Sequence, residues 1–167
     1  MWPEKWKCRS VPLPPAPGLR KVALAWLGGV LTIAILVGLG DWLHVSLILA
    51  SFGASCVLVF GFPEAPFSQP RNVVAGHFLS ALVGLLFLEW LGPQGGALAL
   101  AVGTAIAVMM LTRTVHPPAG SNPVIVFLLQ PGWDFLWFPT LSGAVLLVAV
   151  ALIYNNLRRE PAWPSYW

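Results

Sequence analysis

His116-Pro117-Pro118-Ala119-Gly120-Ser121-Asn122-Pro123 interrupts an otherwise apolar stretch of the chain. Three prolines and a glycine stand here, and with nearby Arg113 the region carries four polar or ionisable residues. Irregular backbone at membrane depth is tolerated only where it is buried in protein or lines a watery cavity. Polar residues at that depth are candidates for function. The segment therefore predicts a break in the fold and the neighbourhood of a functional site.

The composition around this segment is that of an integral membrane protein. Of 167 residues, 57% are hydrophobic and only 9% are charged, whereas soluble domains carry roughly 25% charged residues. The length leaves room for one compact domain. The net charge of +3 is small and all nine Lys and Arg lie at the ends of the apolar runs or outside them. We therefore interpret the charge as a topology signal and expect no nucleic-acid partner.

The apolar residues fall into stretches of two lengths. Four of them are long enough for plain helical spans, which need roughly 20 residues, and two are shorter. Residues 116–130 could still cross the roughly 30 Å core if half of the segment is extended and half is helical. A re-entrant hairpin is the competing geometry. The stretches are about 21–39, 45–61 (short), 72–91, 95–112, 117–130 (short) and 137–156.

The distribution of basic residues favours six crossing segments over four spans with two re-entrant segments. With the N-terminus inside, every basic residue falls on the inner side, whereas the outer loops carry Asp41 and Asp134 and no Lys or Arg. The four-span alternative moves Arg71 and Arg113 outside. The basic residues are Lys5, Lys7, Arg9, Arg20, Lys21, Arg71, Arg113, Arg158 and Arg159.

An internal repeat is visible. Gly53-Ala54-Ser55 aligns with Ala119-Gly120-Ser121 at an offset of 66 positions. Each unit, about 20–91 and about 92–156, contains a long span, a short broken span and a long span. Three crossings per unit would invert the second unit relative to the first, and such repeats place a site where their broken helices meet. We expect an all-α transmembrane domain over 20–156 with a 3+3 inverted repeat, and cytoplasmic tails at 1–19 and 157–167.

The two broken spans suggest an anion site. Proline disfavours helix in the residue before it and fits the first position of a helix. Asn122 is therefore the predicted N-cap of a helix that begins at Pro123, with Gly120 and Ser121 leading into it. Gly53 and Ser55 would do the same in the other unit. The free amides of such helix starts bind anions, although these residues could also be caps without a ligand.

Other polar residues lie close to the breaks in sequence. His77 follows Gly76 on the third span and could contact substrate, relay a proton or bind a backbone carbonyl. His116 could contact substrate or anchor the turn. Arg71, beside Asn72, and Arg113 could attract an anion at the inner side or contact lipid headgroups. The predicted substrate-binding set is Gly53, Ser55, Arg71, Asn72, His77, Arg113, His116, Gly120, Ser121 and Asn122.

Two motifs resemble the HPP family of integral membrane proteins. One is Thr114 to Pro123, which contains the tripeptide that names the family. The other runs from Ser51 through Gly61 and Pro63 to His77. The resemblance covers residues 20–156 and implies a small multi-span protein thought to be a transporter, with plant and cyanobacterial relatives linked to nitrite movement. The family is usually described with four spans, whereas our count is six.

Together these features predict a transporter or channel for a small inorganic anion, with nitrite the leading candidate. A non-transporting membrane scaffold or accessory subunit is the alternative. A membrane enzyme is disfavoured because no HExxH, CxxC, Walker A or GxSxG motif occurs. We expect no cofactor and no metal, contact with membrane lipid and a homo-oligomer. The expected location is the bacterial inner (plasma) membrane, with both termini in the cytoplasm.

Overall fold

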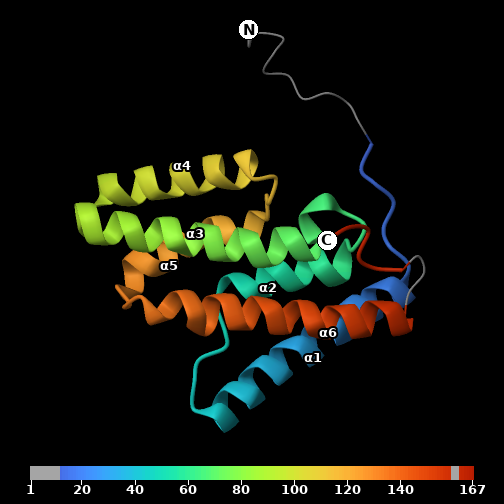
Figure 1. The fold of residues 1–167 in the computed structure, drawn as a ribbon. Coiled ribbons are helices and arrows are strands. Elements are labelled where there is room, and N and C mark those ends of the chain that lie inside the picture. The colour runs from blue at the N-terminus through green and yellow to red at the C-terminus, as the bar shows by residue number, and fades with distance from the viewer. Residues whose placement is uncertain (1–11, 159–161) are drawn as a thin grey trace, which may run out of the picture.

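The computed structural model describes residues 12–158 and 162–167, and within them it is helical without strands (Figure 1). Residues 1–11 of the predicted N-terminal tail and 159–161 of the C-terminal tail lie outside the described residues. The elements are α1 (Leu19–Leu43), α2 (Ser51–Cys56) continued by the π-helical η2 (Val57–Gly61), the 3-10 turn η3 (Pro66–Ser68), α3 (Pro70–Leu91), α4 (Gly95–Leu111), the 3-10 segment η4 (Pro117–Ser121), α5 (Asn122–Leu129), the π-helical η5 (Leu136–Leu141) and α6 (Ser142–Arg158).

In the part of the chain that the structure describes, three helices are long and apolar enough to cross a membrane, namely Leu19–Leu43, Pro70–Leu91 and Leu136–Leu157. Helix α4, with 17 residues, is at the short end of the range for a span. The helical segments Ser51–Gly61 and Pro117–Leu129 are shorter still. The prediction of an all-helical membrane protein is therefore confirmed. Among the described residues, three of the four stretches expected to be long spans form long helices, and the fourth, α4, is shorter.

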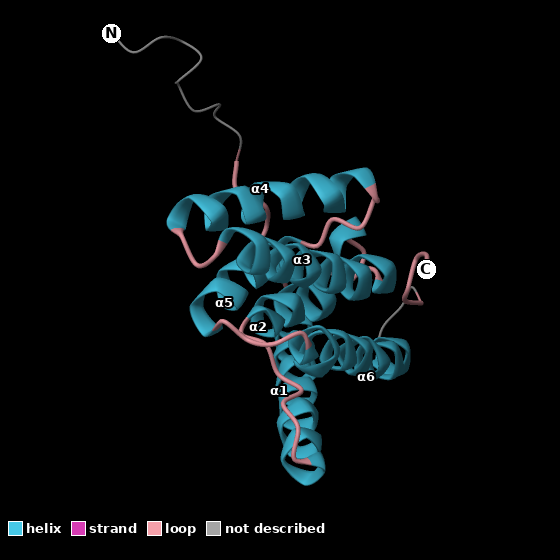
Figure 2. Cartoon of the chain, turned by 60° about the vertical axis from the view of Figure 1, so that its left-hand side comes forward, coloured by secondary structure: helices cyan, strands magenta, loops and turns pink. Residues whose placement is uncertain are grey.

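The two short helices lie inside the bundle. Both views show α2 and α5 between a layer formed by α3 and α4 and a layer formed by α1 and α6 (Figures 1 and 2). Helix α5 runs alongside α3, because a Cβ on Gly84 of α3 would meet Pro123 and Val126 of α5. The two short helices run in opposite directions from the place where their first residues lie. Helix α2 and η2 run toward the beginning of α3, whereas α5 runs toward the end of α3.

We use the name HPP segment for residues 114–123, and part of this segment is more helical than the sequence predicted. His116 is extended, with φ −133° and ψ 100°, as expected before a proline. The following residues do not stay extended, because Pro117–Ser121 forms a 3-10 helix closed by Ala119 N–H donating to the His116 carbonyl at 2.9 Å. Prolines suit the first positions of a helix, where no N–H is needed. Helical structure therefore begins at Pro117.

Both predicted N-caps are wrong. Asn122 has helical angles, φ −61° and ψ −41°, and lies in the helical run itself. Ser55 lies inside α2, which begins four residues earlier at Ser51. Neither helix has a side-chain cap hydrogen bond. The side chain of Asn122 is free to make tertiary contacts because the local backbone does not use it. The Oγ of Ser55 has one local backbone acceptor, the carbonyl of Ser51 at 3.3 Å, beside its shorter tertiary contacts.

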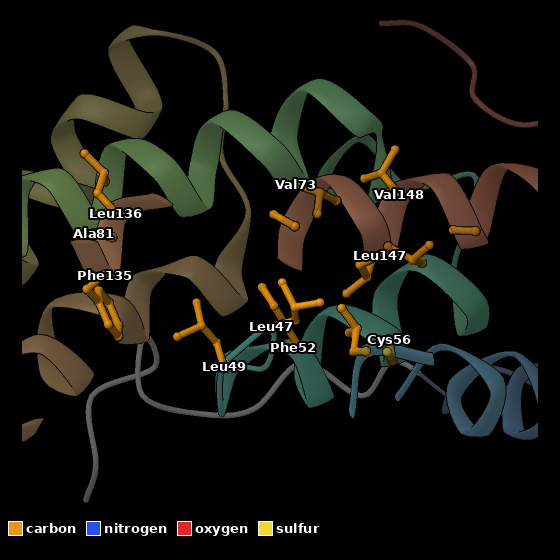
Figure 3. Close-up of a cluster of buried hydrophobic side chains, with 14 of the residues drawn as sticks. Leu47, Leu49, Phe52, Cys56, Val73, Ala81, Phe135, Leu136, Leu147 and Val148 are labelled. Atoms are coloured by element: carbon orange, nitrogen blue, oxygen red, sulfur yellow. The ribbon is translucent and has the colours of Figure 1, made fainter. Parts of the chain in front are cut away.

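The apolar core joins the two layers around α2. Phe52 and Leu147 are fully buried there, together with Val73 of α3 (Figure 3). Helix α6 comes close to α2 at Gly143, where a Cβ would clash with the carbonyl of Leu47 and the ring of Phe52. Tight packing through small residues is the usual way in which membrane helices associate.

We expect Gly143→Ala to destabilise the protein relative to Gly103→Ala by about 2 kcal/mol, because overpacking against backbone costs about 1–3 kcal/mol. Gly103 is the matched control, since a Cβ there would meet nothing within 4 Å. The measurement is unfolding by SDS titration in detergent micelles, followed by tryptophan fluorescence. Equal stability of the two variants would contradict the close approach of α6 to Leu47.

Charged residues are divided between the two ends of the bundle. Arg20 and Lys21 lie at the start of α1, Arg71 lies at the start of α3, and Arg113 follows the end of α4. Figure 1 shows these helix termini at one end of the molecule. Acidic residues near the opposite helix termini are Asp41, Glu89 and Asp134, whereas Glu64 lies in the connection before α3.

Candidate functional site

A polar cluster lies where α2, α3, the HPP segment and α5 meet. We use the name polar cluster for Ser51 and Ser55 of α2, His77 of α3, His116, and Asn122 of α5. Ser55, His77, His116 and Asn122 are fully buried and Ser51 is 4% exposed. His77 lies seven residues into α3, which places the cluster about 10 Å from the start of that helix.

The cluster is joined by short hydrogen bonds. The Oγ of Ser55 lies 2.9 Å from Nε2 of His77 and 2.8 Å from Nε2 of His116. The amide nitrogen of Asn122 lies 3.1 Å from Nδ1 of His77, and Ser51 Oγ–H donates to Asn122 Oδ1 at 2.9 Å. Ring centroids of His77 and His116 are 5.0 Å apart. Three chain segments distant in sequence, around Ser55, His77 and residues 116–122, therefore share one buried network.

The backbone carbonyl of Phe67 determines the proton positions at one end of this network. It lies 2.7 Å from Nδ1 of His116 and can only accept a hydrogen bond. Nδ1 of His116 must therefore carry the hydrogen. In the neutral imidazole, Nε2 is then an acceptor, so the Ser55 hydroxyl donates to it. Ser55 in turn accepts from Nε2–H of His77.

The other end leads independently to the same assignment. The amide nitrogen of Asn122 donates to the backbone carbonyl of His77 at 3.0 Å, which orients the amide. The same nitrogen donates to Nδ1 of His77, so the hydrogen of His77 is on Nε2. Asn122 Oδ1 is left to accept from Ser51. Two backbone carbonyls therefore assign one consistent direction to the whole network with both imidazoles neutral.

The local sequence explains how these side chains converge. Ser51 and Ser55 are four residues apart and so share a face of α2. Gly76 lets the HPP segment approach α3, because a Cβ there would be 2.9 Å from both His116 Cβ and the Thr114 carbonyl. The ring of Phe52 contacts His77 edge-on, with centroids 5.0 Å apart, and closes the apolar side of the cluster.

Further side chains hold the HPP segment against its neighbours. Ser80, one turn after His77, donates to the Ala119 carbonyl at 2.6 Å. Asn72 donates to the Val115 carbonyl at 2.9 Å. These two bonds satisfy backbone carbonyls that the irregular segment leaves free. The hydroxyl of Tyr166, in the last described residues, is within reach of Asn72 Oδ1 at 3.2 Å and of the Pro66 carbonyl at 3.0 Å, and can donate to one of them at a time.

The structure brings together four of the predicted site residues, namely Ser55, His77, His116 and Asn122. The other six lie outside the polar cluster. Ser121 is exposed and donates to the Pro118 carbonyl at 2.8 Å, and Gly53 is exposed on α2. Arg71 and Arg113 are exposed, Gly120 is half-buried and Asn72 is buried beside Val115. Arg71 donates to the carbonyl of Thr112, after the end of α4, at 3.1 Å.

Two participants in the network were missed as site residues. Ser51 precedes Ser55 by one helical turn, so an α2 that begins at Ser51 would have revealed it. The Phe67 carbonyl has no signal in the sequence, because its contact with His116 spans 49 positions.

A cavity of about 420 Å³ lies on the α5 side of the cluster. Its wall includes Ala50, the residue before Ser51, as well as Ile125 and Leu129 of α5. Asp134 is the charged residue in its lining. Among the described residues, no group of three or more His, Cys, Asp or Glu could hold a metal ion.

Comparisons with known proteins agree with the resemblance in the two motifs. The family described as "HPP, transmembrane region" matches residues 14–164. Two proteins of Dictyostelium discoideum, each named a transmembrane protein, are 36% and 35% identical to the chain and cover 92% and 98% of it. The chain spans 58% and 56% of their lengths. No solved structure matches. The chain thus belongs to the HPP family of transmembrane proteins.

Proposed function

We propose that this protein is a membrane transporter or channel for a small inorganic anion, with nitrite as the leading candidate. The observation that carries the proposal is the buried polar cluster inside a bundle of membrane-type helices. Polar side chains at this depth are costly and usually mark a substrate or ion pathway. Hydroxyl, amide and imidazole N–H groups are hydrogen-bond donors suited to an anion.

The arrangement of the broken helices supports the same proposal. Ser51 and Asn122, the first residues of α2 and α5, are joined by a hydrogen bond of 2.9 Å. The two helices lead away toward opposite ends of α3. This is the arrangement expected of two inverted three-segment units, in which a site forms between broken helices. We propose that an anion binds beside Ser51 and Asn122, where the two short helices meet.

The ends of the bundle suggest a direction for the path. The cavity lined by Ala50 and Asp134 would be the access from one side. Arg71 and Arg113 are exposed at the other end, where they would attract an anion. Because basic residues favour the cytoplasmic side, we propose that this second end and both chain termini face the cytoplasm.

We also propose that the protein works as a homo-oligomer. Only 17% of the most apolar part of α1 is buried, compared with 44% for α3. Gly38 of α1 has no neighbour within 4 Å of an added Cβ. Such a small residue would allow another helix to approach closely.

Purified protein in liposomes should transport nitrite faster than protein-free liposomes do. The assay compares nitrite, nitrate, formate and chloride under the same concentration gradient, with protein-free liposomes to measure leakage of the weak acids. We expect saturable uptake of nitrite and weaker uptake of chloride. No uptake of any of these anions by correctly folded protein would overturn the proposal.

A second candidate is a non-transporting scaffold or accessory subunit. The observation that favours it is that the polar cluster forms one continuous hydrogen-bond chain in which each imidazole nitrogen has a partner. Such a network can serve only to fix helix positions. The same liposome assay separates the two candidates, because a scaffold would give no saturable flux.

A further inference from the structure

The hydroxyl of Ser55 has two acceptors within reach. It lies 2.8 Å from Nε2 of His116 and 3.3 Å from the backbone carbonyl of Ser51. A hydroxyl has one hydrogen and can donate to only one of them at a time. When His116 is neutral, its Nε2 is an unprotonated acceptor and the shorter bond is made. The carbonyl of Ser51 is then the alternative partner.

Adding a proton to Nε2 of His116 would convert that nitrogen into a donor. It would then donate to Ser55 Oγ, and the Ser55 hydrogen would turn to the Ser51 carbonyl. Ser55 would accept from both imidazoles and donate once, which uses the full capacity of a hydroxyl. The network can therefore hold one extra proton by rotating a single hydroxyl.

An anion at this site needs such a proton. Burying an uncompensated charge costs far more than burying a polar group. The polar cluster contains no Lys or Arg, and the exposed Arg71 donates to Thr112 instead. The cavity beside the cluster carries the carboxyl group of Asp134, which would repel an approaching anion. The imidazoles are the groups of the cluster that can supply a positive charge.

We propose that His116 binds one proton for each anion transported, with the Ser55 hydroxyl as the switch that accommodates it. The proton comes from water on one side of the membrane, joins the lone pair on Nε2 and leaves with the anion on the other side. His77 is the titratable side chain that faces His116, with ring centroids 5.0 Å apart. Two adjacent imidazolium ions would repel each other, so one proton is held. This inference rests on the proposed anion transport.

The contacts of the neighbouring elements contain no competing charge. Helix α2 contributes the hydroxyl of Ser55, α5 contributes the amide of Asn122 by way of His77, and the connection before α3 contributes the Phe67 carbonyl. None of these groups titrates near neutral pH. Protonation of the cluster would therefore depend on the two histidines.

The test uses liposomes that contain the protein and a fluorescent pH indicator, with the membrane potential set by potassium and valinomycin. A nitrite gradient should acidify the lumen by about one proton per anion taken up, beyond the acidification in protein-free liposomes, since one positive charge neutralises one anion. The uptake rate should rise as the outer pH falls and should not change with membrane potential.

Two variants separate the switch from general damage. Ser55→Ala removes a hydrogen bond to the protonated imidazole, so its pH–rate profile should move to lower pH by about one unit or more. Ser80→Ala removes another buried hydroxyl, which donates to the Ala119 carbonyl, and should leave the pH–rate profile in place.

Nitrogen-15 NMR of labelled histidines in nanodiscs gives a readout without transport. It should show His116 protonated on Nδ1 and His77 on Nε2 at neutral pH, and a proton added to Nε2 of His116 in acid.

The outcomes distinguish the two proposals. Nitrite uptake that carries a net negative current without protons would overturn proton coupling and leave anion transport intact. No uptake of any anion would overturn both. Neutral His116 protonated on Nε2, or an unchanged profile in Ser55→Ala, would overturn the role of the hydroxyl switch.

Discussion

Asn122→Asp is expected to lower the free energy of unfolding by about 4 kcal/mol at neutral pH, the cost of an uncompensated buried charge. The amide nitrogen of Asn122 donates to the carbonyl of His77 at 3.0 Å and to Nδ1 of the same residue at 3.1 Å. An aspartate oxygen in that position cannot donate when ionised. It would face the carbonyl oxygen without a hydrogen between them, in a fully buried site.

Unfolding by SDS titration in micelles measures this loss. Gln130→Glu is the matched control, because it makes the same change from amide to carboxyl on an exposed residue just after α5. We expect the control to stay within about 0.5 kcal/mol of the parent protein. If Asn122→Asp were as stable as this control, the amide would not be what orients His77, and the deduced network would be wrong.

The position of the break in the fold was predictable from local chemistry. Pro117 and Pro118 lack the N–H groups that a continuing helix needs, so they had to stand at a helix start. Four predicted site residues, among them His116 and Asn122, meet in the polar cluster. Their convergence follows from two short helices whose first residues lie together inside the bundle.

The helix limits were less predictable. Proline disfavours helix at Asn122 only weakly, and packing of the fully buried Asn122 side chain against α3 overrides this preference. Ser55 was predicted as a cap, although α2 begins at Ser51. Caps are chosen by local backbone geometry, whereas these side chains make bonds to residues 22–71 positions away. Sequence alone cannot weigh such contacts against local preference.

The direction of the network was beyond prediction for a different reason. It depends on the carbonyls of Phe67 and His77, and every residue has such a carbonyl. Only the three-dimensional structure tells which carbonyl faces which nitrogen. The role of Arg71 is a similar case, since its contact with the carbonyl of Thr112 depends on how α3 and α4 pack.

Gly76→Leu is expected to separate the HPP segment from α3. A Cβ at residue 76 would lie 2.9 Å from the carbonyl oxygen of Thr114 and 2.9 Å from Cβ of His116. The carbonyl of Thr114 is part of the backbone, and Cβ of His116 is bonded directly to the backbone. Neither atom can therefore move unless the HPP segment moves. Moving it would break the 2.8 Å contact of His116 with Ser55 and the 2.7 Å contact with the Phe67 carbonyl.

We expect this variant to lose about 3 kcal/mol of stability, the upper range for overpacking, and to show nitrite uptake no faster than protein-free liposomes. Gly103→Leu is the control, because residue 103 has open space around it and should keep both stability and uptake. The histidine NMR signals provide a third measurement, since the displaced His116 should lose its single tautomer. Gly76→Leu with parental uptake and an unchanged His116 signal would show that transport does not require α3 and the HPP segment in contact. The function would then have to be sought away from the polar cluster, in the cavity lined by Ala50 and Asp134.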